Sequence, residues 1–342
     1  MNVLMKIYPK NAANVLIFSL AFLFSCQRKP LDVDVSGVKQ EKITIKRMEK
    51  DLFETSFDSL YSKKLLNNYG VFYTHFISGI INTGGMHDSL YLQNLKRFIN
   101  DKDMHEAYLE TQHQYTELNE LSDQLTDAFK HFSFYFPNRK IPLVVTYMSG
   151  FNYSIVNMDG VLGIGLEMYL GSDNKFYKMI QLPKYKVNVM RSEYILPDCM
   201  RGWMSNEFEN NHSPNDFLGQ IIQTGKTMYL VDALLPEVDD TLKIGYTHKQ
   251  MEWCKKHEFN VWSYFIQQKL LYSKEISEII KYTSDGPFTS AFNKESPSRT
   301  GNWIGWQIVK TYMKRNPDIT LQQLIVKDVQ EIFTKSKYKP GK

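Results

Sequence analysis

Cys26 is the residue of this chain whose chemistry can be predicted most directly from the sequence. It closes the run Leu23-Phe24-Ser25-Cys26, at the end of an apolar stretch over residues 15–24 that follows Lys6 and Lys10. Basic residues, a short apolar run and a small residue before the cleavage point are typical of a secretory signal, and a cysteine at that place indicates a bacterial lipoprotein signal. The apolar run of about ten residues is well below the roughly 20 that span a bilayer.

The chemistry of lipidation requires a thiol at Cys26. The sulfur is alkylated by a diacylglycerol, residues 1–25 are cleaved off as the signal peptide, and the freed amine receives a further acyl chain such as palmitate. Each buried methylene contributes about 0.8 kcal/mol, so two or more chains anchor stably where one binds reversibly. We therefore predict a lipid anchor at Cys26. The alternatives are an ordinary secretory signal with a chance cysteine, or a start that is not cleaved.

Histidine and glutamate could together form a zinc site, but their spacing here argues against it. Zinc hydrolases of the zincin type use His-Glu-x-x-His on a helix, because histidines four residues apart face one metal ion. The chain has His257-Glu258, but Val261 stands where the second histidine belongs. The predicted helix after the hairpin, 197–209, has no histidine. We predict no metal site, no cofactor and no catalytic set, with His257 and Glu258 as weak catalytic candidates.

Glu258 lies in the middle of an apolar helical stripe. Its neighbours on the helical wheel are Met251, Cys254, Val261, Trp262 and Phe265. An unpaired buried carboxylate is costly, so either a cation meets Glu258, or its pKa is raised, or the helix lines a wet cleft. The residue is then either a paired core glutamate or a functional carboxylate.

Arg299, Gly301 and Gly305 stand at the start of a predicted helix over 302–315. Arg299 beside a helix N-terminus could meet an anion, whereas glycines one turn apart permit a close approach of a second helix. Both readings stay open. The acidic stretch 232–240 lacks the ligand spacing of a calcium loop, and we expect a solvated surface there.

Composition favours one large globular domain. The chain has a net charge of +4 with basic and acidic residues intermixed, which argues against a nucleic-acid footprint. Residues 26–42 are polar and without periodicity, so they are predicted to be a flexible tether, followed by a single domain over 43–342. Cys199 and Cys254 are too few for a disulfide framework. They are expected to be buried thiols, although they could pair in an oxidising envelope.

Apolar spacing predicts a mostly helical α+β fold. A first short strand contains Ile43 and Ile45, and Asp159-Gly160 predicts a tight hairpin turn. The expected strands are 143–147, 153–157 and 161–166, and the expected helices are 58–68, 88–99, 103–132, 197–209, 215–234, 246–272, 302–315 and 320–332. The sheet is expected to be small and antiparallel.

Several separated motifs resemble, in the same order, the GldB family of gliding-motility lipoproteins. Besides the run ending at Cys26, they are Arg47-Met48-Glu49-Lys50-Asp51-Leu52-Phe53, Gly163-Ile164-Gly165-Leu166, His248-Lys249-Gln250-Met251-Glu252-Trp253-Cys254, Asp285-Gly286-Pro287-Phe288-Thr289, Ser296-Pro297-Ser298-Arg299-Thr300-Gly301-Asn302-Trp303-Ile304-Gly305 and Asn316-Pro317. The resemblance covers essentially the whole chain after the signal peptide.

The resemblance implies a protein of Bacteroidetes required for gliding, a process tied to type IX secretion. The family is similar to a predicted zinc-peptidase family without its metal ligands, which implies a degenerate zincin-like fold and a non-enzymatic envelope component. Its implied partners are other gliding and secretion envelope proteins, not nucleic acid. Gln27-Arg28-Lys29-Pro30 lacks the acidic residues of surface lipoproteins, so we expect a periplasm-facing anchor. The alternatives are a membrane-tethered hydrolase acting through Glu258 and His257, and a module that binds cell-wall glycan or peptide.

Overall fold

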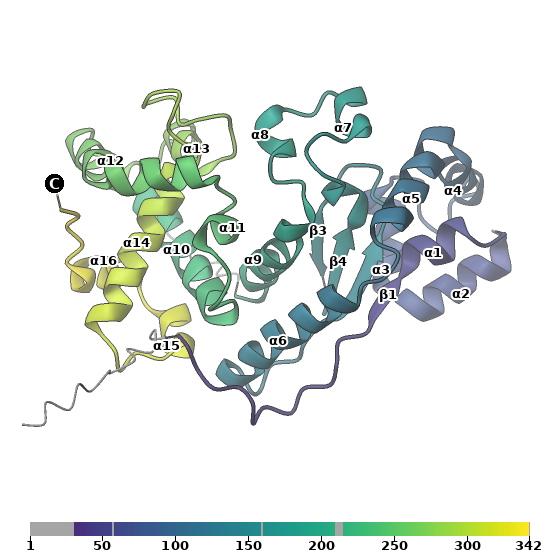
Figure 1. Ribbon diagram of the computed structural model, residues 1–342, viewed down its shortest axis with the longest axis horizontal. Coiled ribbons are helices and arrows are strands. Elements are labelled where there is room, and N and C mark those ends of the chain that lie inside the picture. The colour runs from purple at the N-terminus through teal and green to yellow at the C-terminus, as the bar shows by residue number, and fades with distance from the viewer. Residues whose placement is uncertain (1–30, 57, 159, 209–214, 342) are drawn as a thin grey trace, which may run out of the picture.

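A computed structural model describes residues 31–341 apart from 57, 159 and 209–214. The molecule is elongated, with the sheet and the N-terminal helices towards one end and the C-terminal helices at the other (Figure 1). The predicted α+β class, mostly helical with one small sheet, is confirmed.

The sheet has four strands in the order β1-β2-β4-β3. They are β1 (Ile45–Arg47), β2 (Leu143–Tyr147), β3 (Ile155–Met158) and β4 (Val161–Gly165). The antiparallel hairpin of β3 and β4 is where the sequence predicts it, and Gly160 has the positive φ of 78° that its turn requires. Asp159 lies outside the described residues. The other two pairings, β1 with β2 and β2 with β4, are parallel, so the sheet is mixed rather than antiparallel throughout.

The N-terminal helices cover this sheet. They are α1 (Met48–Phe53), α2 (Ser59–Tyr69), α3 (Val71–His75) continued by a π-helical turn (Phe76–Ile80), α4 (Tyr91–Asn100), α5 (Lys102–Gln114) and α6 (Asn119–Tyr135). The sequence predicts one long helix over 103–132, and this is wrong, because the chain breaks between α5 and α6.

Two residues account for the break. The hydroxyl of Tyr115 donates to the carbonyl of Tyr169 at 2.6 Å. The hydroxyl of Thr116 bonds back to the carbonyls of Gln112 and His113, which satisfies acceptors at the end of α5. These tertiary contacts cannot be predicted from the spacing of apolar residues.

The rest of the chain is helical after the hairpin. Its elements are the 3-10 turn η2 (Leu166–Tyr169), α7 (Lys175–Met179), α8 (Lys184–Val187), the turn η3 (Ser192–Tyr194), α9 (Ile195–Glu207), α10 (Phe217–Leu234), α11 (Asp240–Ile244), α12 (His248–Gln267), the turn η4 (Leu270–Tyr272), α13 (Ile276–Thr283), α14 (Thr300–Arg315), α15 (Leu321–Val326) and α16 (Val329–Ser336). The predicted helix over 320–332 is two helices, because Asp328 accepts from the Glu331 amide and starts α16.

Helices α10 and α14 pack side by side through glycines (Figure 1). A Cβ atom on Gly305 would lie 1.8 Å from the carbonyl oxygen of Ile221, and one on Gly225 would lie 2.3 Å from the carbonyl oxygen of Gly305. A Cβ atom on Gly301 would lie 2.9 Å from the carbonyl oxygen of Tyr282. The two backbones are therefore in direct contact, and no side chain larger than hydrogen fits at these positions.

The stretch predicted as a tether lies, from Leu31 on, along α6 (Figure 1). At one end of α6 the Tyr135 hydroxyl donates to the carbonyl of Leu31 at 3.4 Å. At the other end the Ile43 amide donates to the Thr126 hydroxyl at 2.9 Å, and the Ser122 hydroxyl donates to the Ile43 carbonyl at 2.5 Å. These contacts hold the segment from Leu31 to Ile43 against α6, with Leu31 beside the C-terminal end of that helix.

We predict that Gly305→Ala destabilises the fold. Alanine is favoured over glycine in a helix by about 1 kcal/mol, so a loss of stability would come from the clash with Ile221. Overpacking costs typically 1–3 kcal/mol and occasionally more, and we expect a net loss of about 2 kcal/mol or more in urea unfolding. Gly37→Ala is the control, since a Cβ there meets nothing within 4 Å. Equal stability of the two variants would contradict the close contact.

Candidate functional site

The carboxyl ends of the parallel strands gather two buried glutamates. Glu49, at the start of α1, accepts from the Arg47 guanidinium at 2.8 Å and from the Thr146 hydroxyl at 2.7 Å. Glu167, directly after β4, is fully buried. Strand ends of this kind often carry ligand sites in α/β sheets. Neither residue stands out in the sequence as a site, although each follows a short β-rich run.

Glu167 holds the loop that follows β2. Its Oε1 accepts from the amide and hydroxyl of Ser149, both at 2.5 Å, and from the amide of Phe151 at 3.2 Å. Phe151 has a φ of 64°, a strained value for a bulky residue, and these bonds keep it there. Burial raises the pKa of Glu167 to about 7, although the bonds from Ser149 and Phe151 oppose the shift.

Glu258 and His257, the two weak catalytic candidates, point to different partners. The Tyr338 hydroxyl donates to Glu258 at 2.6 Å, and burial raises the pKa of this carboxyl. The His257 ring lies 4.7 Å from the Trp253 ring. The partner of Glu258 is thus a phenol rather than a cation, and nothing in this geometry joins the two residues into one reacting pair.

Arg299 is engaged by protein groups at the start of α14. Its Nε lies 3.0 Å from Asp285, its Nη2 donates to the carbonyl of Gly245 at 3.3 Å, and its guanidinium lies over the Tyr246 ring at 5.4 Å. The anion that Arg299 meets in this structure is therefore the Asp285 carboxylate. Gly305 serves the contact of α14 with α10, and Gly301 lies against the Tyr282 carbonyl of α13.

Asp198, a residue of α9, lies near enough to Arg299 for the charge of Arg299 to act on it. The Tyr169 hydroxyl donates to Asp198 at 2.9 Å, and the Arg201 guanidinium pairs with its other oxygen. Arg201 also donates to the carbonyl of Lys243 at 2.6 Å, which ties α9 to α11. Burial raises the pKa of Asp198 against the opposing charge of Arg201.

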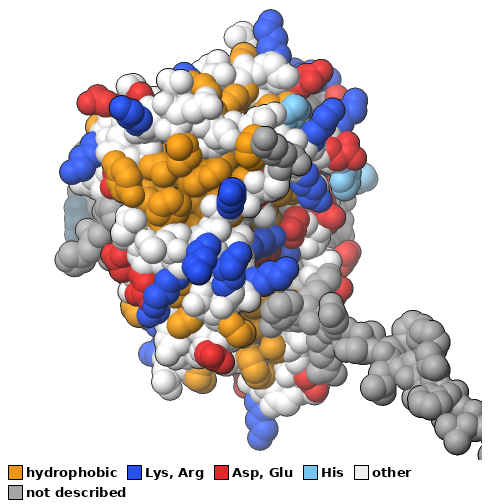
Figure 2. All heavy atoms as spheres, turned by 90° about the vertical axis from the view of Figure 1, so that its left-hand side faces the viewer, with side chains coloured by type: hydrophobic (Ala, Val, Ile, Leu, Met, Phe, Trp, Pro, Cys, Tyr) orange, Lys and Arg blue, Asp and Glu red, His pale blue; other side chains and the backbone are white. Residues whose placement is uncertain are grey.

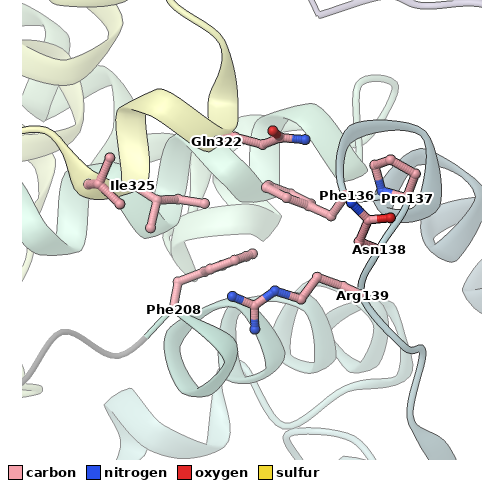
Figure 3. A pocket seen from close by; sticks show the side chains of 8 residues that line it. Phe136, Pro137, Asn138, Arg139, Phe208, Gln322 and Ile325 are labelled. Carbon is pink, nitrogen blue, oxygen red and sulfur yellow. The ribbon is translucent and has the colours of Figure 1, made fainter.

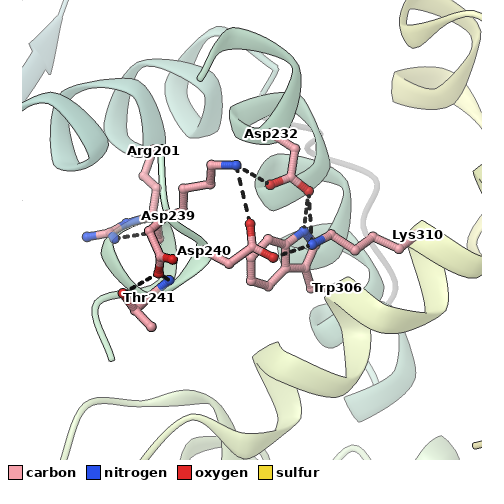
Figure 4. A network of polar contacts seen from close by, with 8 residues as sticks. Arg201, Asp232, Asp239, Asp240, Thr241, Trp306 and Lys310 are labelled. Carbon is pink, nitrogen blue, oxygen red and sulfur yellow. Dashed lines mark hydrogen bonds and ion pairs between the residues drawn. The ribbon is translucent and has the colours of Figure 1, made fainter. Parts of the chain in front are cut away.

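The acidic stretch 232–240 is only in part the solvated surface that the sequence predicts, because Glu237 and Asp239 are exposed but Asp232 is not. Asp232 is buried near the end of α10 and lies 3.1 Å from Lys243, which is also buried. The Trp306 indole donates to Asp232 at 2.8 Å, and Lys310 reaches Asp240 at 2.9 Å and Asp232 at 3.4 Å. Figure 4 shows this network, in which α10, α11 and α14 meet.

The sequence does contain a signal for Asp232. The residue stands between Val231 and Ala233 in a helix with apolar residues on every side, just as Glu258 stands within an apolar stripe. A lone carboxylate in such a helix is buried and needs partners. The density of acids over 232–240 favoured a surface assignment, and the proximity of Lys243 and Lys310 in space could not be seen in the sequence.

A surface pocket of about 260 Å³ lies between the loop after α6 and helix α15. Figure 3 shows Phe136 and Phe208 facing each other across it, with the Arg139 guanidinium beside Phe208. That guanidinium lies 5.3 Å from the Phe208 ring and pairs with Glu207 at 2.7 Å. Gln322 and Ile325 of α15 form the opposite wall.

Within the described ranges no group of three or more His, Cys, Asp or Glu side chains could hold a metal ion. Cys199 and Cys254 are free and buried. In that same part of the chain, no helix is both long and apolar enough to cross a bilayer. Cys26 lies outside the described residues, so its lipidation stays a prediction.

The family described as gliding motility protein GldB matches residues 28–340. This chain belongs to the GldB family. It is therefore a gliding motility protein, and the match spans nearly all of the chain that follows Cys26. No curated protein and no solved structure matches the chain, and the zincin-like relation of the fold stays a prediction.

We predict a pH-dependent stability that Glu167→Gln removes. The folded chain keeps a proton on Glu167 up to about pH 7, whereas the unfolded chain releases it near pH 4.5. Stability should therefore fall by up to about 3 kcal/mol as the pH rises from 4.5 to 7. Urea unfolding across this range should show a smaller fall in the glutamine variant.

The control is the same substitution at Glu120, an exposed residue of α6. It should leave the pH dependence of the native chain in place. A glutamine variant at Glu167 with an unchanged fall would show that the proton is held elsewhere.

Proposed function

We propose that this GldB family member is a lipid-anchored envelope protein that supports gliding through protein contacts rather than by catalysis. Cys26 carries the anchor, and residues 43–342 form one folded body. The family match supports this layout because it begins at residue 28, directly after the predicted site of cleavage and lipidation.

The observation that carries the proposal is how four buried or half-buried carboxylates are used. Asp232 is paired by two lysines and an indole, Asp198 by an arginine and a phenol, and Glu258 by a phenol. Glu167 receives three hydrogen bonds from one loop. Perturbed carboxylates mark functional sites when they face a cleft, but these four hold elements of the fold together.

The proposed partners are other envelope proteins of the gliding machinery and the type IX secretion system tied to it. Membership of a gliding motility family supports partners of this kind. A periplasm-facing anchor is the orientation that Gln27-Arg28-Lys29-Pro30 favours, since no acidic residue directly follows Cys26.

We expect Cys26→Ala to abolish spreading of the cells while the body still folds. Loss of the thiol removes the acyl chains, and the chain should move from the membrane fraction to the soluble fraction. Cell fractionation and a spreading assay on agar measure the two effects. Cys254→Ala is the control, because it removes a buried thiol and leaves the anchor.

A Cys26→Ala chain that stays in the membrane fraction would contradict the anchor. A soluble Cys26→Ala chain that restores full spreading would contradict the proposal that the body must be held at a membrane.

A further inference from the structure

Leu31 is held at a fixed place on the body. Leu31 is half-buried, and its carbonyl accepts from the hydroxyl of Tyr135 at the end of α6. Further along, Gln40 accepts from the Ser133 hydroxyl at 3.4 Å, and Lys42 pairs with Asp123. The segment that joins the body to the anchor is therefore not free over its whole length, because its second part is laid along α6.

Leu31 is only five positions after Cys26, with four residues between them. A chain spans at most about 3.6 Å per residue, so acyl chains on Cys26 enter the bilayer within roughly 18 Å of Leu31. This distance is less than the diameter of a folded body of about 300 residues, whose radius of gyration is roughly 19 Å. The surface around Leu31 is therefore the part of the body that the anchor holds nearest to the membrane.

That surface has the composition of a membrane-contacting one. The Gln322 side chain donates to the carbonyl of Tyr135 at 2.7 Å, which places α15 beside the end of α6. Phe134 is 45% exposed and Val326, at the end of α15, is 79% exposed. The loop that continues from α6 exposes Arg139 and Lys140.

We infer that this surface, formed by the end of α6, the loop 137–140 and the end of α15, rests on the phospholipid bilayer that holds the anchor. Phe134 and Val326 enter the headgroup region, where aromatic and aliphatic side chains next to basic residues are favoured. Lys140 faces the lipid phosphates, whereas the Arg139 guanidinium beside it is paired with Glu207. The inference rests on the proposed lipidation of Cys26, and it replaces a body held away from the membrane by one that lies on it.

A second exposed apolar surface is the alternative site of membrane contact. Figure 2 views the end of the molecule formed by the C-terminal helices and shows an apolar patch with basic side chains near it. Tyr272, Ile276 and Ile280 of η4 and α13 are 60%, 71% and 52% exposed. The end of α6 is the surface tied to Leu31, because the Tyr135 hydroxyl donates to the Leu31 carbonyl and Gln322 of α15 donates to the Tyr135 carbonyl.

The test places a fluorophore on the mature lipidated chain in vesicles of phosphatidylethanolamine and phosphatidylglycerol. Val326→Cys supplies an exposed thiol, and Cys199 and Cys254 are buried and stay unlabelled. A quencher carried on the lipids should remove most of the emission from the label at Val326. Leu60→Cys is the matched control: it is 73% exposed on α2, at the other end of the molecule, and should keep its emission.

Two quenching results would overturn the inference. An anchored chain that shows equal quenching at positions 326 and 60, or quenching at Ile276→Cys with none at Val326→Cys, would place the bilayer elsewhere. A native chain that does not float with the vesicles would overturn the anchor itself, and flotation therefore separates failure of the proposed function from failure of this surface.

Discussion

Helices α10 and α14 touch through their backbones, and the C-terminal half of the molecule is built around that contact. Gly225 and Gly305 allow it, since a Cβ atom on either would collide with a carbonyl group of the opposite helix. The contact also brings Asp232 of α10 to Trp306 and Lys310 of α14. Without the glycines, the buried carboxylate would lose the partners that make its burial tolerable.

Helix α9 connects the packed pair of α10 and α14 to the sheet. Helix α9 packs against β3 and β4 on one side and against α10 on the other. Arg201 of α9 donates to the carbonyl of Lys243, whose side chain pairs with Asp232. Charged groups therefore run from α9 through α11 and α10 to α14, and burial raises the pKa of both Asp198 and Asp232 among them. Burying these charged groups costs desolvation free energy, but their pairing fixes the relative positions of the helices. A fixed arrangement of this kind suits a body that presents a fixed surface.

Local chemistry made much of the fold predictable. The hairpin follows from its Asp-Gly turn, and α9, α10 and α14 follow from apolar spacing, with boundaries within about two residues of the predicted ones. Tertiary contacts decided the rest. The hydrogen bond from Tyr115 to Tyr169 divides a predicted helix, and the parallel pairing of β1 with β2 joins residues about 100 apart. The docking of Leu31 on Tyr135 lies in a segment predicted to be a tether, although Leu31, Val33 and Val35 alternate with polar residues and are half-buried.

In-cell crosslinking with mass spectrometry tests most directly whether this protein works through contacts at a membrane. The account predicts crosslinks from the folded body to other envelope proteins of the gliding machinery, and their loss in cells whose chain carries Cys26→Ala and remains folded. Motile cells in which the native chain crosslinks to no envelope protein, or identical crosslinks with and without the anchor, would contradict it.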